Sequence, residues 1–184
     1  LARWKRGIGC LGESPSYRML TYYTIPSYNY IQFMEQILYR YNPWWEKEFK
    51  IEKFFARPEV FKNLADNLSG RQVVILTGLR RVGKTTLMKQ MVDYLINEKK
   101  VDPRLIFYAS LDDYLLADKN LLEIIEAYRK IHKLSFSKKV FLFLDEITYQ
   151  KNFAIQLKNI YDQQNAKLYV SSSSASKRNG IRLW

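Results

Sequence analysis

The sequence predicts an α/β protein whose mainly parallel sheet forms the middle layer of a three-layer sandwich. Short apolar runs rich in β-branched residues alternate with longer segments of helical period from residue 58 onward. This alternation is typical of strand–helix–strand units. A loop of pattern G-x-x-x-x-G-K-[ST] joins the first such strand to the next helix. The run VFLFLDE at 140–146 is apolar almost throughout and ends in two carboxylates, which suits a strand buried on both faces.

The expected elements follow in chain order. Residues 1–29 have no sustained period, and we expect them to be irregular. Hydrophobic periodicity predicts helices over residues 30–41, 58–70, 84–99, 119–133 and 152–165. It predicts strands over residues 71–78, 104–110, 139–146 and 167–174.

Local signals support individual elements. Pro58 stands in the first turn of its helix and Gly70 at its end, where each residue type is favoured. In the helix at 84–99, Leu87, Met91 and Leu95 fall on one face and would pack against the sheet. These signals support the predicted order of elements from residue 58 onward.

The chain is expected to divide into three parts. Residues 1–41 are an aromatic N-terminal segment, irregular or partly helical, which we suspect lies outside the natural reading frame. Residues 42–175 are expected to form the core, and residues 176–184 a basic tail where we expect the core to be cut short by truncation. The adjacent Trp44 and Trp45 need burial or a partner, and packing on the core is favoured over stacking on an adenine or another chain.

The composition is that of an ordinary globular protein. The 184 residues are 47% hydrophobic and 26% charged, enough for one domain with a proper core. A single cysteine, Cys10, excludes an internal disulfide and is typical of a reducing compartment. No apolar run approaches the ~18 residues of a membrane span. We therefore expect a cytoplasmic protein without a membrane partner.

The net charge of +12 favours nucleic acid as a partner, but its distribution limits that inference. Residues 1–33 and 171–184 carry seven Lys or Arg against one Glu, whereas the other 137 residues carry 23 basic and 17 acidic groups. The core is thus only mildly basic, and contact with nucleic acid is expected from the two ends.

The glycine-rich loop is expected to hold the phosphates of a nucleotide. Glycines allow the sharp turn that brings backbone N–H groups against phosphate oxygens, and the following helix adds its positive end. Lys84 would reach the β- and γ-phosphates from an exposed position, and the Thr85 hydroxyl would bind Mg²⁺. Arg80 and Arg81 would add positive potential or contact a neighbouring subunit, with solvated charges an equal alternative. The expected nucleotide-binding residues are Gly78, Leu79, Arg80, Arg81, Val82, Gly83, Lys84, Thr85 and Thr86.

Two acids at the end of the third expected strand complete the chemistry. In parallel sheets ligands gather at the carboxyl ends of strands, where the loop and this pair should meet. Asp145 is then placed to hold Mg²⁺, usually through water, and Glu146 to orient and deprotonate an attacking water. One histidine, His132, and one cysteine exclude zinc sites and Ser/Cys–His nucleophile systems.

Asp112 and Asp113 follow the second expected strand at the same edge of the sheet. A solvated turn is favoured for them over a role with substrate or metal.

The segments ILTGLRRVGKTTL, FLFLDEI and YVSSSS resemble the prokaryotic, largely archaeal, AAA-type P-loop ATPases over residues 42–175. The resemblance implies a P-loop NTPase fold with the strand order P-loop strand, fourth, third, second. It also implies a polar sensor at the end of the fourth strand, with Ser171, Ser172 and Ser173 as candidates and Ser172 named as catalytic. Family members continue with a fifth strand and a lid, and often act through neighbouring subunits, so a homo-oligomer is an expected state. We expect neither a fifth strand nor a lid here.

The sequence therefore predicts a Mg²⁺-dependent ATPase that couples ATP hydrolysis to a conformational change, with Lys84, Glu146 and Ser172 as catalytic residues. The alternative is a nucleotide-switched, nucleic-acid-associated binding module with little or no hydrolysis. A P-loop kinase is disfavoured because adjacent Asp145 and Glu146 favour water as the acceptor. The sequence has no N-K-x-D-like signature, which disfavours GTP.

Overall fold

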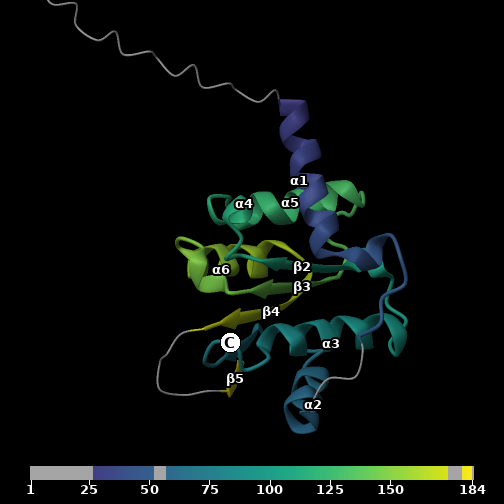
Figure 1. The fold of residues 1–184 in the computed structure, drawn as a ribbon, viewed down its shortest axis with the longest axis vertical. Helices are drawn as coiled ribbons and strands as arrows, with labels where there is room; N and C mark the ends of the chain where they lie inside the picture. Colours follow the sequence, from purple (N-terminus) through teal and green to yellow (C-terminus); the bar gives the residue numbers. More distant parts are fainter. Residues whose placement is uncertain (1–26, 52–56, 174–179, 184) are drawn as a thin grey trace, which may run out of the picture.

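The structure is a computed structural model that describes residues 27–51, 57–173 and 180–183. Across these residues one sheet lies between two layers of helices (Figure 1). Its strands are β1 (Val74–Thr77), β2 (Ile106–Ser110), β3 (Val140–Asp145), β4 (Ala166–Ser172) and β5 (Gly180–Leu183). The helices are α1 (Ser27–Tyr41), α2 (Pro58–Asp66), α3 (Lys84–Asn97), α4 (Tyr114–Ala117), α5 (Leu121–Ile131) and α6 (Phe153–Gln163). Short 3₁₀ turns are η1 (Pro43–Trp45), η2 (Pro103–Leu105) and η3 (Ile147–Tyr149).

The strand order in the sheet is β2-β3-β4-β1-β5. The pairs β1–β4, β3–β4 and β2–β3 are all parallel, which confirms the predicted α/β class and the order of the four predicted strands. Helical crossovers between them bring the carboxyl ends of β1, β3 and β4 to one edge of the sheet.

The fifth strand was not expected, and that expectation was wrong. Gly180–Leu183 pairs antiparallel with β1, with Gly180 opposite Thr77 and Leu183 opposite Val74. Four residues after a serine-rich segment carry no periodic signal of their own. They form a strand because β1 would otherwise end the sheet with unpaired backbone groups.

Side chains alternate along each strand and build one hydrophobic core on each face of the sheet. Phe107, Leu142 and Leu168 point to the face covered by α1, α5 and α6, whereas Phe143 and Tyr169 point to the face covered by α2 and α3. In Figure 1, α1, α4 and α5 lie above the strands and α2 and α3 below them. Asp145 follows Phe143 in this alternation and therefore faces α3.

The segment after α1 covers the outer edge of β2, one of the two terminal strands of the sheet. Asn42 lies with 0% exposure and exchanges hydrogen bonds with the backbone of Tyr108, accepting from its N–H at 2.6 Å and donating to its carbonyl at 2.9 Å. Trp44 and Trp45 both donate their indole N–H to the carbonyl of Ile106, at 3.1 and 3.0 Å. These side chains satisfy backbone groups that an exposed edge strand would leave unpaired.

The two tryptophans pack on the core, as the favoured interpretation predicted. Trp44 is 3% exposed, and Trp45 stacks on Tyr128 with ring centroids 5.6 Å apart. His132 ends α5 and meets the Trp45 ring edge-on at 4.4 Å, so it belongs to the same aromatic cluster.

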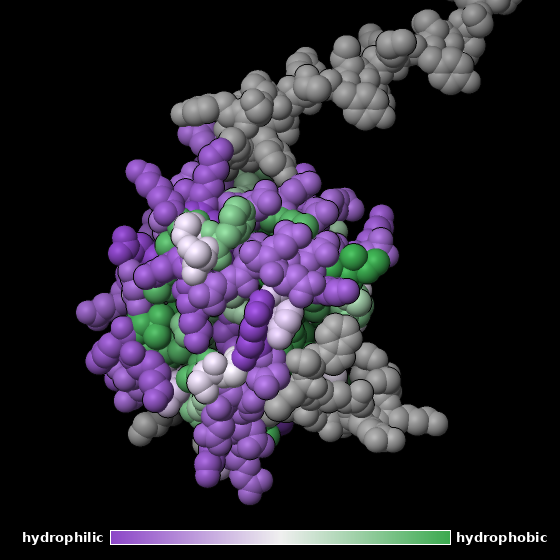
Figure 2. All heavy atoms as spheres, turned by 180° about the vertical axis from the view of Figure 1, so that it is seen from behind, coloured by the Kyte–Doolittle hydropathy of each residue, from purple (hydrophilic) through white to green (hydrophobic). Residues whose placement is uncertain are grey.

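One face of the molecule is mostly polar. Figure 2 shows hydrophilic side chains over most of the face seen from behind, with hydrophobic residues in small separate patches. No helix in the described parts of the chain is both long and apolar enough to cross a membrane.

Candidate active site

The loop at residues 78–83 connects β1 to α3 and is fixed at both ends. The Gly78 N–H donates to the Ser172 carbonyl at 3.3 Å, which ties the start of the loop to β4. At the other end Gly83 has φ +87°, a left-handed conformation in which a side chain would be strained. Its carbonyl accepts the first helical hydrogen bond of α3 from Leu87 N at 3.0 Å. The amino end of α3 is thereby aimed into the loop, an arrangement that favours anions.

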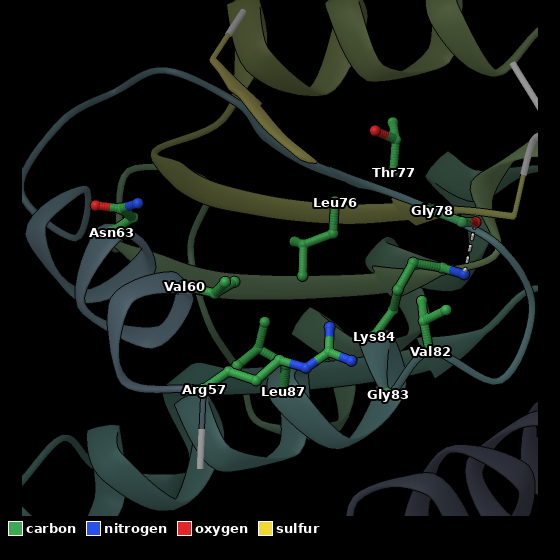
Figure 3. Close-up of a pocket in the computed structure, with 10 residues that line it drawn as sticks. All are labelled: Arg57, Val60, Asn63, Leu76, Thr77, Gly78, Val82, Gly83, Lys84 and Leu87. Carbon is green, nitrogen blue, oxygen red and sulfur yellow. Dashed lines mark hydrogen bonds between the residues drawn. The ribbon is translucent and has the colours of Figure 1, made fainter. Parts of the chain in front are cut away.

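Lys84, the first residue of α3, is buried at 8% exposure, so the expectation that it is exposed was wrong. Its ammonium group turns back over the loop and donates to the carbonyls of Leu79 at 3.0 Å and Gly78 at 3.3 Å, the latter drawn in Figure 3. It also donates to the Ser173 hydroxyl at 2.8 Å and lies 3.8 Å from a Glu146 carboxylate oxygen. These partners offset the cost of burying the charge.

Asp145 accepts hydrogen bonds from hydroxyl groups on three different elements. The Thr85 hydroxyl donates to Asp145 Oδ2 at 2.5 Å and the Tyr108 hydroxyl to the same oxygen at 2.9 Å. The Ser171 hydroxyl donates to Oδ1. Asp145 is 1% exposed and is held by α3, β2 and β4 at once.

The Thr85–Asp145 pair suits a small hard cation. Mg²⁺ prefers oxygen ligands and is usually held by one or two carboxylates together with substrate phosphates. In the described residues there is no group of three or more His, Cys, Asp or Glu that could hold a metal by itself. The donor set therefore fits Mg²⁺ bound with a nucleotide rather than a metal caged by protein alone.

Glu146 follows Asp145 in a left-handed conformation with φ 53°, which is uncommon for a residue other than glycine. This turn at the end of β3 sends the two adjacent carboxylates to different partners. The Glu146 N–H donates to the Ser171 hydroxyl at 2.9 Å, and its carboxylate accepts from the Ser173 N–H at 3.1 Å and from the Ser173 hydroxyl. Strain of this kind concentrates at functional sites.

The three candidate serines lie in different surroundings. Ser171 and Ser173 contact Asp145 and Glu146 through their hydroxyls, because alternate residues of an extended chain share one face. Ser172, the serine named from the sequence, is 7% exposed and accepts from Gly78 through its carbonyl. Of the three hydroxyls, that of Ser173 joins Lys84 to Glu146.

A pocket of about 470 Å³ opens beside the loop, between α2 and the start of α3. Figure 3 shows Arg57 extending across it from the start of α2, with Val60 and Leu76 forming an apolar wall. Its size lies within the range of small-molecule sites, and its mixed lining is typical of them. It is lined by Arg57, Val60, Asn63, Leu76, Thr77, Gly78, Val82, Gly83, Lys84 and Leu87.

The α2 side of this pocket and the Tyr108–Asp145 hydrogen bond were not predicted from the sequence. Arg57 directly precedes the helix-opening Pro58, and that helix leads into the loop strand, which is a weak signal. In the sequence, Tyr108 looks like an ordinary residue of a buried strand, so no local pattern predicts its contact with Asp145.

Other residues singled out from the sequence lie around the site. Arg80 donates to the Tyr149 hydroxyl at 2.5 Å, and Arg81 is exposed with φ 63°. Asp113 does not lie in a solvated turn, although that was the favoured interpretation of the sequence. It caps α4 by accepting from Leu115 N at 2.9 Å, and it accepts from Arg40 at 2.7 Å.

Burial alone would raise the pKa of Asp113. The hydrogen bonds from Tyr41 and Leu115 N and the charge of Arg40 lower it overall.

Comparison with known proteins found a family model, a curated relative and similar solved structures. The model of a family described as AAA domain matches residues 70–181. An uncharacterized protein of Methanocaldococcus jannaschii is 34% identical over 150 residues, which is 81% of this chain and 30% of that protein. The chain thus spans about 30% of the length of this curated relative. The solved structure of C. elegans PCH-2 aligns with a TM-score of 0.44 and 17% identity, over 66% of this chain and 38% of that one.

Proposed function

The chain belongs to the AAA-domain family of P-loop ATPases, and on this premise we propose that it binds ATP with Mg²⁺ at residues 78–86 and hydrolyses it. The hydrolysis would drive a conformational change. The observation that carries the proposal is the hydrogen-bonded chain Lys84–Ser173–Glu146, which links the phosphate loop to an acid at the same sheet edge.

Nucleotide binding divides between the pocket and the loop. The nucleoside would occupy the space between α2 and α3, against Val60 and Leu76 and beside Arg57. The triphosphate would run along the loop toward the amino end of α3, where Lys84 exchanges its loop carbonyls for phosphate oxygens. Asp145 and Glu146 do not line the pocket, and we expect them to face the γ-phosphate end of the nucleotide.

Hydrolysis requires a base and a group that holds it. Glu146 would take a proton from the attacking water, and Ser173 would orient both the base and the water. We name Ser173 for this role beside the earlier candidate Ser172, because its hydroxyl reaches Lys84 and Glu146 together. Mg²⁺ held by Thr85 and Asp145 would neutralise charge on the phosphates.

Phosphate release measured with Glu146→Gln tests the proposal. The change should lower the rate by at least about a hundredfold, the lower range for a general base, while ATP affinity stays within about twofold. Glu98→Gln, exposed at the opposite end of α3, is the matched control and should keep the wild-type rate. Ser173→Ala should slow release more than Ser172→Ala does. Equal rates for wild type and Glu146→Gln would refute hydrolysis by this site.

The second candidate is a nucleotide-switched module that binds nucleic acid and hydrolyses slowly. It is favoured by the basic ends, where seven Lys or Arg stand against one Glu. DNA affinity that falls steeply with salt, together with phosphate release unaffected by Glu146→Gln, would support it. A homo-oligomer and a cytoplasmic location are further proposals and rest on the resemblance and the composition.

A further inference from the structure

We propose that Tyr108 is a positioning residue for the Asp145 carboxylate, and that Asn42, in the segment upstream of the AAA match, holds Tyr108 in place. The inference rests on the proposed function, because it concerns how Asp145 is presented to Mg²⁺ and ATP. Tyr108 lies within the region that matches the AAA domain, whereas Asn42, which holds it, lies upstream of residues 70–181.

Asp145 is oriented by hydroxyl groups on both of its oxygens. Ser171 donates to Oδ1, and Thr85 and Tyr108 share Oδ2, at 2.5 and 2.9 Å. Thr85 is expected to bind the metal. If its hydroxyl oxygen bound Mg²⁺, its hydrogen bond to Asp145 would be lost or redirected. The hydrogen bonds from Tyr108 on β2 and Ser171 on β4 would remain, and they would orient the carboxylate from the two strands that flank β3.

The Tyr108 hydroxyl is itself rigidly placed. The residue is 2% exposed, Tyr41 lies 6.2 Å away between ring centroids, and the Lys89 ammonium lies 5.6 Å from the ring centre. A buried donor with a single acid partner is suited to orientation rather than proton transfer.

The backbone of Tyr108 is held from outside the sheet by Asn42. The Asn42 side chain binds the N–H and the carbonyl of Tyr108 and also donates to Leu38 O at 2.8 Å, at the end of α1. A continuous path of contacts therefore joins α1 to Asn42, Tyr108 and Asp145. Outer partners of this kind, which orient metal ligands, typically change metal affinity by 10- to 100-fold when removed.

Tyr108→Phe tests the inference, because it removes the hydroxyl and keeps the ring. The matched control is Tyr169→Phe, another fully buried tyrosine, whose hydroxyl donates to Leu64 O at 3.0 Å and does not reach the acids. Binding of an ATP analogue with a nitrogen bridge between the β- and γ-phosphates is titrated calorimetrically in Mg²⁺ and in EDTA. The ratio of the two dissociation constants reports the metal without any turnover.

Tyr108→Phe should reduce the Mg²⁺ enhancement of binding by about 10- to 100-fold and leave affinity in EDTA within about twofold. Tyr169→Phe should keep the wild-type ratio. An unchanged ratio for Tyr108→Phe, or an equal loss in both variants, overturns the inference while the proposed function stands. If the wild-type chain binds no analogue in either condition, the proposed function itself fails, and the inference fails with it.

Discussion

Asn42→Ala removes the side chain that closes the outer edge of β2, and its cost can be worked out from the structure. The amide makes three hydrogen bonds, two to the Tyr108 backbone at 2.6 and 2.9 Å and one to Leu38 O at 2.8 Å, at 0% exposure. A net loss of about 1 kcal/mol per bond gives about 3 kcal/mol of unfolding free energy. The buried N–H and carbonyl left on Tyr108 make this a lower bound.

Urea unfolding followed by circular dichroism measures this loss directly. With an unchanged m-value, the midpoint should fall in proportion to about 3 kcal/mol, and the melting temperature should drop by roughly 6–12 °C for a chain of this size. Asn165→Ala is the matched control, because the Asn165 side chain is exposed and donates to Ser137 O at 3.0 Å. It should cost less than about 1 kcal/mol. A loss below about 1 kcal/mol for Asn42→Ala would refute the argument that this side chain closes the sheet edge.

Two further predictions concern lysines. Lys84→Ala should weaken ATP binding by at least about a hundredfold in calorimetry while the chain stays folded, since charge-assisted bonds to phosphate are lost. Lys158→Ala, at an exposed position of α6, is its control, and unchanged affinity for Lys84→Ala would contradict the assignment of the loop. Burial, and then the charge of Lys139, lower the pKa of Lys167 from 10.5 to about 8. The unfolded chain then binds more protons between pH 8 and 10.5, so stability should rise with pH across that window. The urea midpoint of the wild type should rise over this range relative to Lys167→Met, and parallel curves would show that Lys167 titrates normally.

The fold could largely be predicted from the sequence, because its signals are local. The strands and main helices carry their own period, and the phosphate loop and the acids at the end of β3 are short patterns with a set order. Strand order came with the resemblance and was confirmed. Gly180–Leu183 was missed because a four-residue strand is decided by the partner that it pairs with.

The amino-acid sequence by itself determined the α/β class, the glycine-rich loop and the pair of acids, because each depends on a short pattern of neighbouring residues. Only the tertiary structure decided which groups surround Asp145 and Glu146. Tyr108 and Asp145 are 37 positions apart, and Lys84 and Ser173 are 89 apart, so no local pattern relates them. Folding brings them together because parallel strands place their carboxyl ends at one edge, where burial favours hydrogen bonds between the charged groups and nearby hydroxyls.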